Sequence, residues 1–439
     1  MIISHMSINV RLYREGDEEG IVNVINSAFG SFRGWGLNVE KWLEYDEDDF
    51  AFNKNLALVA EIDGKIVGHV MLMLREFKLG KNTYIKFGGV ANVSTMPEYR
   101  GRGIATRLMT KAIEVCKEKD LSLSSLLTGY DGIAHGIYRK VGYTDTLFES
   151  SFRGKRREME EAYQNLPENN SIQIREAEIS DLETFSSLYD KSLIAYNGVC
   201  RRPLEYWKKK IFDKKYYHSF FYVTKGIYKI LAFKNRIPTG YAIYGVSEEA
   251  DRRIGFPPFS GGILELVGLD NESRIALFKH ILNEFLSKKL KFMVFSFPDS
   301  EDYKRLTRFF KKIGSSGILM DYVTNQDKLF TELKNELSLR LEEYGGFNRL
   351  RFALVSEYGE TNLEVSGNEV DIIENNSDNK IMINKDYFVR MIYGIDSFKD
   401  ILLKNGIISI KIEKFKKVYE LLNVMFPRRE FHIWTIDHW

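Results

Sequence analysis

The sequence predicts two consecutive α/β units followed by a smaller α+β unit. The chain has 439 residues, which is too long for one compact core and suggests two or three domains. Two sets of residues, each opening a strand that is followed by a helix, recur 164 positions apart: Ile8, Val10, Arg11 and Asp17, then Ile172, Ile174, Arg175 and Asp181. Such a repeat indicates that one architecture occurs twice. From about residue 327 the pattern changes to a helix followed by alternating strands, as in a two-layer α+β unit.

Composition places the chain among soluble globular proteins. Hydrophobic residues make up 44% and charged residues 28%, and the formal net charge of +2 favours neither nucleic acid nor an anionic membrane as a partner. The two cysteines, Cys116 and Cys200, lie far apart, so they form neither a disulfide framework nor a paired metal motif. No stretch approaches the roughly 20 apolar residues of a membrane-spanning helix. We therefore expect a cytoplasmic protein without a metal, a nucleic-acid partner or a membrane partner.

The first unit contains a glycine-bearing turn between a strand and a helix. The strand, residues 89–95, stops before Pro97 because proline removes a backbone donor and restricts the residue before it. The helix begins near Arg102, and its apolar positions recur with a helical period: Ala105, Leu108, Ala112 and Val115. Free N–H groups and the positive dipole at a helix start can bind a phosphate, and Gly101 and Gly103 carry no Cβ that would hold a ligand away. Taken alone, this turn could equally cap a helix in any α/β protein.

The segment after this helix adds a second set of signals. A strand at residues 121–127 and a glycine-rich loop at 128–132 lead to a short helix that carries Tyr138 and ends at Gly142. Here the chain resembles the GCN5-related N-acetyltransferases, the GNAT family. Their signature is Arg or Gln, any two residues, Gly, any residue, then Gly or Ala, and it is met by Arg100, Gly103 and Ala105. The resemblance implies a mixed central sheet flanked by helices and acetyl-CoA as the cosubstrate.

The second unit keeps the architecture of the first without its glycine turn. A final strand of the first unit near residues 148–153 and a polar linker at 153–170 precede it. The strand at 262–267 and the helix at 273–286 are separated by residues 268–272, which bring two carboxylates to the place of the turn. Carboxylates there would repel a pyrophosphate. We interpret the second unit as a scaffold that kept the fold and lost the cofactor.

The third unit is similar to the sterol carrier protein fold. Its expected elements are helices at 328–343, 385–393 and 413–426, strands at 350–357, 361–365, 369–374 and 380–383, and a segment at 407–411. Two GNAT-fold domains followed by such an α+β domain resemble the layout of the Eis (enhanced intracellular survival) acetyltransferases over essentially the whole chain. The resemblance implies a catalytic domain at 1–165, a degenerate GNAT-like domain at 166–326, and a domain at 327–439 that donates the C-terminus to the active site. It also implies a homo-oligomer such as a hexamer.

The GNAT resemblance also implies which residues hold acetyl-CoA. Backbone N–H groups of the turn would bind the pyrophosphate, with an arginine adding charge, and the strand end would pair with the pantetheine arm and direct an N–H at the thioester carbonyl. The residues concerned are Val93, Ser94, Thr95, Arg100, Gly101, Arg102, Gly103, Ile104, Ala105 and Thr106. Tyr138 lies four residues before Gly142, where the family has a tyrosine beside the cofactor sulfur. It would act as general acid toward the departing thiolate, or would only orient the sulfur by a hydrogen bond.

The Eis resemblance implies that a carboxylate at the end of the chain takes the proton from the acceptor amine. The final segment, residues 431–439, is too apolar to leave in water, so we expect Trp439 to be buried. Eis-like chains usually end in phenylalanine, whereas this sequence ends in tryptophan preceded by His438. The base is therefore the carboxylate of Trp439, the imidazole of His438 or a water between them.

Residues 29–50 are the expected wall for the acceptor. This segment contains Trp35, Trp42 and an acidic run that begins at Asp46, and aromatic faces with carboxylates suit a polycation. A charged, solvated loop is an equally good interpretation of the same residues. The resemblance implies an aminoglycoside, a polyamine or a lysine side chain as the acceptor, and the sequence does not select among them.

Two rival hypotheses start from the same motifs. One is a tandem acetyltransferase that makes a small thiol in an active second domain, and the carboxylates at 268–272 argue against it. The other is a lipid- or acyl-CoA-binding protein with vestigial acetyltransferase domains, which the intact turn at 100–105 disfavours.

Overall fold

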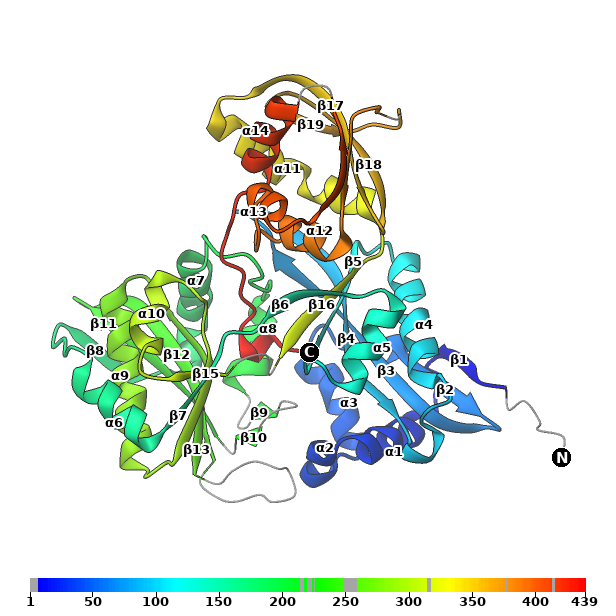
Figure 1. The fold of residues 1–439 in the computed structure, drawn as a ribbon. Helices are drawn as coiled ribbons and strands as arrows, with labels where there is room; N and C mark the ends of the chain where they lie inside the picture. The colour runs from blue at the N-terminus through cyan, green and yellow to red at the C-terminus, as the bar shows by residue number, and fades with distance from the viewer. Residues whose placement is uncertain are drawn as a thin grey trace.

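The part of the chain that the structure describes folds into three units, each built on its own β-sheet (Figure 1). The structure is a computed structural model that describes residues 7–439 except 214–216, 219–222, 225, 248–258, 314–316, 376 and 413–414. The first unit, blue to cyan in Figure 1, lies beside the green second unit, and the yellow and orange third unit packs against one end of the first.

The first unit is a mixed sheet of order β1-β2-β3-β4-β5-β16-β6. Its strands are β1 (Asn9–Leu12), β2 (Ala57–Ile62), β3 (Lys65–Lys78), β4 (Tyr84–Thr95), β5 (Leu123–Thr128), β16 (Ile318–Val323) and β6 (Thr144–Phe148). Its helices are α1 (Glu18–Ala28), α2 (Gly30–Trp35), α3 (Val39–Asp48), α4 (Ile104–Glu118) and α5 (Ile133–Val141), with short 3₁₀ turns η1 (Lys54–Leu56) and η2 (Pro97–Tyr99). Alternate residues of β2 and β3 pack against α4 on one face and α1 on the other. The apolar strands are therefore buried on both faces, as the GNAT resemblance predicts.

The second unit repeats this arrangement in a sheet of order β15-β7-β14-β13-β12-β11-β8. Its strands are β8 (Ile172–Glu176), β11 (Gly226–Lys234), β12 (Ile237–Ser247), β13 (Ser260–Gly268), β14 (Phe292–Ser296), β7 (Ser151–Lys155) and β15 (Lys311–Ile313). Its helices are α6 (Arg156–Asn165), α7 (Leu182–Ser192), α8 (Leu204–Tyr206), α9 (Asn271–Ser287) and α10 (Glu301–Thr307), with a 3₁₀ turn η3 (Ile179–Asp181) and a π-helix η4 (Trp207–Phe212). Strands β9 (Tyr217–His218) and β10 (Val223–Thr224) form a separate small ladder. Two consecutive mixed sheets confirm the tandem α/β prediction.

The first two units exchange strands. The final strand predicted at residues 148–153 is wrong: β6 ends at Phe148 in the first sheet, and the chain continues as β7 between β14 and β15 of the second. In return β16, which follows the second unit in sequence, lies between β5 and β6 of the first sheet. Both exchanged strands bury their backbone edges in the neighbouring sheet, so the two units are interlocked. The domain boundaries near residues 165 and 326 stay predictions.

The third unit packs helices against a smaller sheet of order β19-β18-β17-β20-β21. Its strands are β17 (Phe347–Ser356), β18 (Gly359–Gly367), β19 (Glu369–Ile372), β20 (Lys380–Ile383) and β21 (Ile407–Lys411), and its helices are α11 (Gln326–Tyr344), α12 (Lys385–Ile392), α13 (Phe398–Leu403) and α14 (Phe415–Met425). These bounds lie close to the predicted ones and confirm the α+β class. The likeness to the sterol carrier fold stays a prediction.

The C-terminal tail, residues 426–439, leaves the third unit and runs between the other two (red in Figure 1). Phe431 and Ile433 belong to the apolar core of the third unit, whereas Trp434 and Ile436 are fully buried in that of the second. A short 3₁₀ turn, η5 (Thr435–Asp437), brings the chain to its last residue. Among the helices of the described residues, none is long and apolar enough to cross a membrane.

Candidate active site

The predicted turn between β4 and α4 forms an open start to the helix. Gly101 and Gly103 have φ angles of 79° and 77°, a left-handed conformation that favours glycine. A Cβ at either position would meet no atom within 4 Å, so the space in front of the helix is free. The first turn of α4 contains no acidic residue, and Gly103 caps it without a side chain. The first backbone N–H groups therefore face open space, where a phosphate could accept hydrogen bonds from them.

The side chains around this turn keep its entrance positively charged. Arg100 and Arg102 are exposed, and each donates to a nearby carbonyl, Thr95 O at 3.3 Å and Glu98 O at 3.4 Å. The Arg102 guanidinium also lies over the Tyr99 ring, 5.2 Å from its centroid. Ile104 is buried beneath the helix start, whereas Ala105 and Thr106 are partly exposed. The helix begins at Ile104 and not near Arg102 as predicted, because the two left-handed glycines still turn the chain up to residue 103.

Strands β4 and β5 separate beside this turn. Their parallel pairing runs from Phe87 and Leu123 to Val90 and Leu126 and stops there, although β4 continues to Thr95. A β-bulge, with Asn92 at φ 54°, shifts the register of β4 against β3 just beyond that last pair. Ser94 and Thr95 therefore pair with β3 on one side, and residues 93–95 have left β5 on the other. This opening is suited to a ligand that adds its own hydrogen bonds to the free edge of β4.

Tyr138 lies in α5, four residues before the left-handed Gly142 that ends the helix, as predicted. It is 6% exposed and belongs to the same apolar cluster as Val90 and Leu126, the last paired residues before β4 and β5 separate. Burial raises the pKa of Tyr138 above its ordinary value. The phenol therefore holds its proton at neutral pH, as a proton donor must.

Trp439 lies across β4 and β5 one residue before they separate. Its indole Nε1 donates to Ser125 O at 3.2 Å, and its ring centroid lies 4.9 Å from that of Phe87. A Cβ on Gly89, the residue paired with Ser125, would lie 2.8 Å from the indole, so only glycine leaves room for this ring. The tail is buried from Phe431 to Asp437, as predicted, whereas Trp439 itself is only partly buried.

His438 contacts the partly buried carboxylate of Glu149. Its Nε2 lies 2.9 Å from Glu149 Oε1, an ion-pair distance, although the carboxylate is off the line of a well-formed hydrogen bond. Burial alone would raise the pKa of Glu149, but the neighbouring His438 holds that pKa below its ordinary value. Glu149 and His432 also line a cavity of about 330 Å³ between the three units. The lining of this cavity includes neither Tyr138 nor Trp439.

The predicted acceptor wall is only partly available to a ligand. Trp42 is 1% exposed and packs edge-on against Phe52, so it is a core residue that supports the segment and its predicted contact with an acceptor is not supported. Trp35 is partly buried, with the Lys41 ammonium 4.8 Å above its ring. Asp46 lies in α3, and its side chain is outside the described residues. Both tryptophans lie in short helices, where an aromatic residue predicts packing as readily as ligand contact, so the sequence could not separate them.

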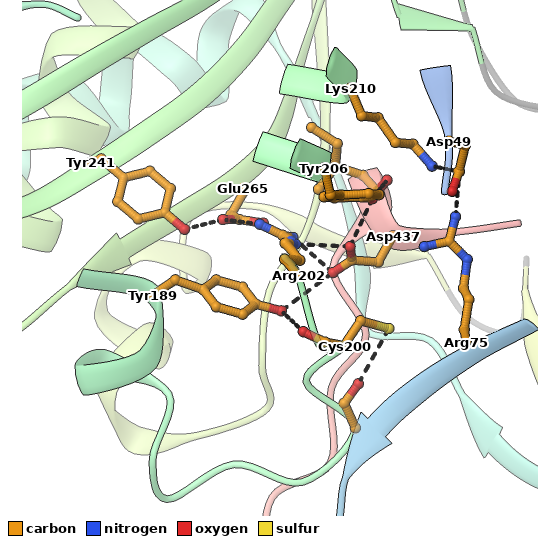
Figure 2. Close-up of polar contacts among 12 residues, drawn as sticks. Asp49, Arg75, Tyr189, Cys200, Arg202, Tyr206, Lys210, Tyr241, Glu265 and Asp437 are labelled. Carbon is orange, nitrogen blue, oxygen red and sulfur yellow. Dashed lines mark hydrogen bonds and ion pairs between the residues drawn. The ribbon is translucent and has the colours of Figure 1, made fainter. Parts of the chain in front are cut away.

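A buried cluster of charges that the sequence did not reveal joins the tail to the other units (Figure 2). Arg202 donates to both carboxylate oxygens of Asp437, at 2.9 and 2.7 Å, and to Glu265 Oε1 at 3.0 Å. Next to it, Asp49 pairs with Arg75 at 2.6 Å and with Lys210 at 2.5 Å. Asp49, the last residue of the predicted acidic run, is thus neutralised inside the protein and is not open to an amine. A carboxylate within the apolar ending of the chain was the one signal of a buried partner for the tail.

The second unit repeats the strand arrangement but closes the turn. Pairing of β13 with β14 ends at Ile263 and Phe295, and a register shift in β13 follows, as in β4. The turn differs, because Asp270 caps α9 by accepting a hydrogen bond from Ser273 N at 2.7 Å. A carboxylate thus occupies the position where a phosphate would accept the same N–H. This geometry agrees with the predicted loss of a cofactor site.

Comparisons with known proteins agree with the fold. The family described as acetyltransferase (GNAT) domain matches residues 9–145. An uncharacterized N-acetyltransferase of Archaeoglobus fulgidus is 34% identical over 126 residues, which are 26% of this chain and 80% of the relative. Two solved structures share the fold of nearly the whole chain. A GCN5-related N-acetyltransferase from Anabaena variabilis (TM-score 0.70, 14% identity) matches over 99% of this chain and 100% of that one. Eis1 from Mycobacterium abscessus (TM-score 0.62, 15% identity) matches over 98% and 100%.

The matched region contains the turn, the strand opening and Tyr138. The relative of which this chain covers four-fifths is itself an N-acetyltransferase. This chain therefore belongs to the GNAT family and is an acyltransferase.

Proposed function

We propose that this enzyme is an acetyl-CoA-dependent N-acetyltransferase of the Eis-like type that acetylates a primary amine in its first unit. The observation that carries the proposal is the opening between β4 and β5. The glycines of the turn, Gly101 and Gly103, border it, and so does Trp439. The whole-chain likeness to the fold of Eis1 supports the Eis-like assignment.

Each chemical step has a candidate residue. The pyrophosphate of acetyl-CoA would bind the free N–H groups of residues 101–106, and its pantetheine arm would pair with residues 93–95. An N–H at this strand end would stabilise the oxyanion that forms when the amine attacks the thioester carbonyl. The new C–N bond forms as the C–S bond breaks, and the thiolate takes a proton from Tyr138.

The base that deprotonates the ammonium lies in the tail. The Trp439 carboxylate belongs to the residue whose indole packs against Gly89, and the His438 imidazole contacts Glu149. Either group, or a water between them, would take the proton, and both directly follow the same 3₁₀ turn. The proposal therefore requires the tail to be held in place during turnover.

The acceptor we propose is an aminoglycoside, a polyamine or a lysine side chain. Residues 29–50, with Trp35 as a partly buried aromatic face, remain the proposed contact surface. Two further predictions are a cytoplasmic location, which the cysteine content favours, and a homo-oligomer such as a hexamer, which the Eis resemblance implies.

A thiol-release assay with acetyl-CoA over a panel of aminoglycosides, polyamines and lysine peptides tests activity and acceptor class together. We expect coenzyme A release that depends on at least one of these amines. Release that is independent of every amine, or no release with an intact, folded chain, would contradict the proposed function.

A further inference from the structure

The opening of the second unit holds the protein's own tail. Beyond the last β13–β14 pair, at Ile263 and Phe295, the η5 turn of the tail packs against β13. The Trp434 ring lies 6.3 Å from that of Phe297, which follows β14, and 6.2 Å from that of Tyr303, whose hydroxyl donates to Leu266 O of β13. Trp434 is fully buried there. The place that corresponds to the β4–β5 opening of the first unit is thus filled by residues 434–437.

Arg202 fixes this tail by charge. Its guanidinium binds Asp437 through two hydrogen bonds, and its side chain and those of Asp437 and Glu265 are at most 1% exposed. The Tyr206 hydroxyl donates to Asp437 Oδ1 at 3.0 Å, and the Tyr241 hydroxyl donates to Glu265. Figure 2 shows these groups converging on the one guanidinium. A buried two-point contact of this kind sets the position and the orientation of the carboxylate together.

Fixing Asp437 also fixes Trp439. The tail makes one tight turn here, with Asp437 N donating to Trp434 O at 2.8 Å and His438 N to Thr435 O at 3.3 Å. Only His438 lies between Asp437 and Trp439, so the span between them is at most about 7 Å. The indole of Trp439 then lies on β4 and β5 of the first unit. A shift of Asp437 must therefore displace the last residue from the first unit.

The same part of the second unit also holds the proposed acceptor segment. Lys210 of η4 and Arg75 of β3 both bind Asp49, which directly follows α3, and the Arg75 guanidinium lies 5.7 Å from the centroid of the Tyr206 ring. Tyr206, of α8, thus contacts the tail through its hydroxyl and the first unit through its ring. The tail and the acceptor segment are therefore both held by contacts with one buried cluster.

We propose that Arg202 is a positioning residue for acetyl transfer: the second unit uses its former substrate opening as a receptor for the tail and so holds Trp439 and His438 at the active site of the first. This inference rests on the proposed function. It explains why a unit without a phosphate turn keeps the full architecture. Arg202 acts through the tail and touches no reacting atom.

The test uses the full chain with two variants, Arg202→Lys and Asp437→Asn, and one matched control, Arg201→Lys. Lysine keeps the charge of arginine but not its two-point contact, and asparagine keeps the shape of aspartate without the charge. Arg201 is the adjacent arginine, but its side chain is 64% exposed and pairs with Glu76 at the surface. Three quantities are measured: kcat, the Kd for acetyl-CoA by calorimetry, and the rate at which carboxypeptidase releases Trp439.

In both variants we expect kcat to fall by at least about tenfold, because a displacement on the order of 1 Å can cost 10²-fold. Release of Trp439 should accelerate by a similar factor, whereas the Kd for acetyl-CoA should stay within about twofold of the wild type. General loss of structure would not lower kcat while leaving acetyl-CoA binding unchanged. The Arg201→Lys control should match the wild type in all three. Wild-type kcat and wild-type tail release in Asp437→Asn would overturn the inference, and so would a loss of kcat accompanied by an equal loss of acetyl-CoA binding.

Asp437→Asn decides the question if Arg202→Lys does not fold, because Arg202 then keeps Glu265 as its partner. Tail release needs no turnover, so the two proposals fail separately. A wild-type chain that acetylates no amine refutes the proposed function. Unchanged tail release in the variants refutes the role of Arg202 as the clamp.

Discussion

At the scale of single residues, the proposed site depends on two positions, Gly89 and Tyr138. Gly89 leaves the space that the Trp439 indole occupies, and Tyr138 places a buried phenol in the apolar cluster beside the strand opening. One residue decides where the tail can lie, and the other decides what can be donated to the leaving thiolate. Each can be changed by a small substitution without removing a charge from the core.

Gly89→Ala should displace the last residue of the chain. The new Cβ would lie 2.8 Å from the indole, which is closer than side chains approach one another, so Trp439 must shift. We expect kcat to fall about 10-fold to 100-fold with acetyl-CoA binding retained. Gly136→Ala is the matched control, since a Cβ at that position meets no atom within 4 Å. Equal kcat values for the two alanine variants would show that the position of Trp439 does not matter for turnover.

Tyr138→Phe removes only a hydroxyl from a buried ring. If the phenol protonates the thiolate, kcat should fall on the order of 10²-fold in steady-state assays, and the Kd for acetyl-CoA should not change. Tyr130→Phe, in the loop before α5 and 45% exposed, serves as the control. Unchanged turnover in Tyr138→Phe would leave this residue with a purely structural role.

At the scale of elements, the exchanged strands explain both what the sequence predicted and what it missed. The turn at 97–105 was predictable because proline and glycine act locally, and α5 was predictable from its left-handed Gly142. The pairing of β16 with β5 and β6 was not, because periodicity indicates that a strand forms without indicating its neighbour. The contact of Arg202 with Asp437 was missed for a related reason, since 235 positions separate the two residues.

Strand β16 also carries a buried carboxyl group, Asp321, whose pKa is raised. Burial raises the pKa of Asp321 from its ordinary 3.8 to about 6, although the Tyr393 hydroxyl donates to it at 2.8 Å. The native state then binds this proton more tightly than the unfolded state, so the contribution of Asp321 to stability is lost as pH rises from about 4 to about 6. At neutral pH the loss is about 3 kcal/mol.

Asp321→Asn should abolish this loss. In denaturant unfolding, the free energy of unfolding of the variant relative to the wild type should increase from pH 4 and level off above about pH 6. Parallel pH curves for the two proteins would show that Asp321 titrates alike in the folded and unfolded states.

At the scale of the whole molecule, the proposed function has three units contributing to one site. The first supplies the turn, the strand opening and Tyr138; the second holds the tail through Arg202; and the third is the origin of that tail. The second unit has the strand opening but places Asp270 where the first has glycine. We therefore predict that only the first of the two similar sheets binds a phosphate.

Calorimetric titration of the full chain with acetyl-CoA tests this claim most directly, in the wild type and in Gly103→Asp and Gly103→Asn. Aspartate and asparagine both tolerate the left-handed conformation at this position, but only aspartate brings the charge that Asp270 brings to the second unit. We predict one site per chain in the wild type, binding weakened at least about tenfold more by Gly103→Asp than by Gly103→Asn, and no second site. Two sites per chain, or equal binding by the two variants, would contradict the account.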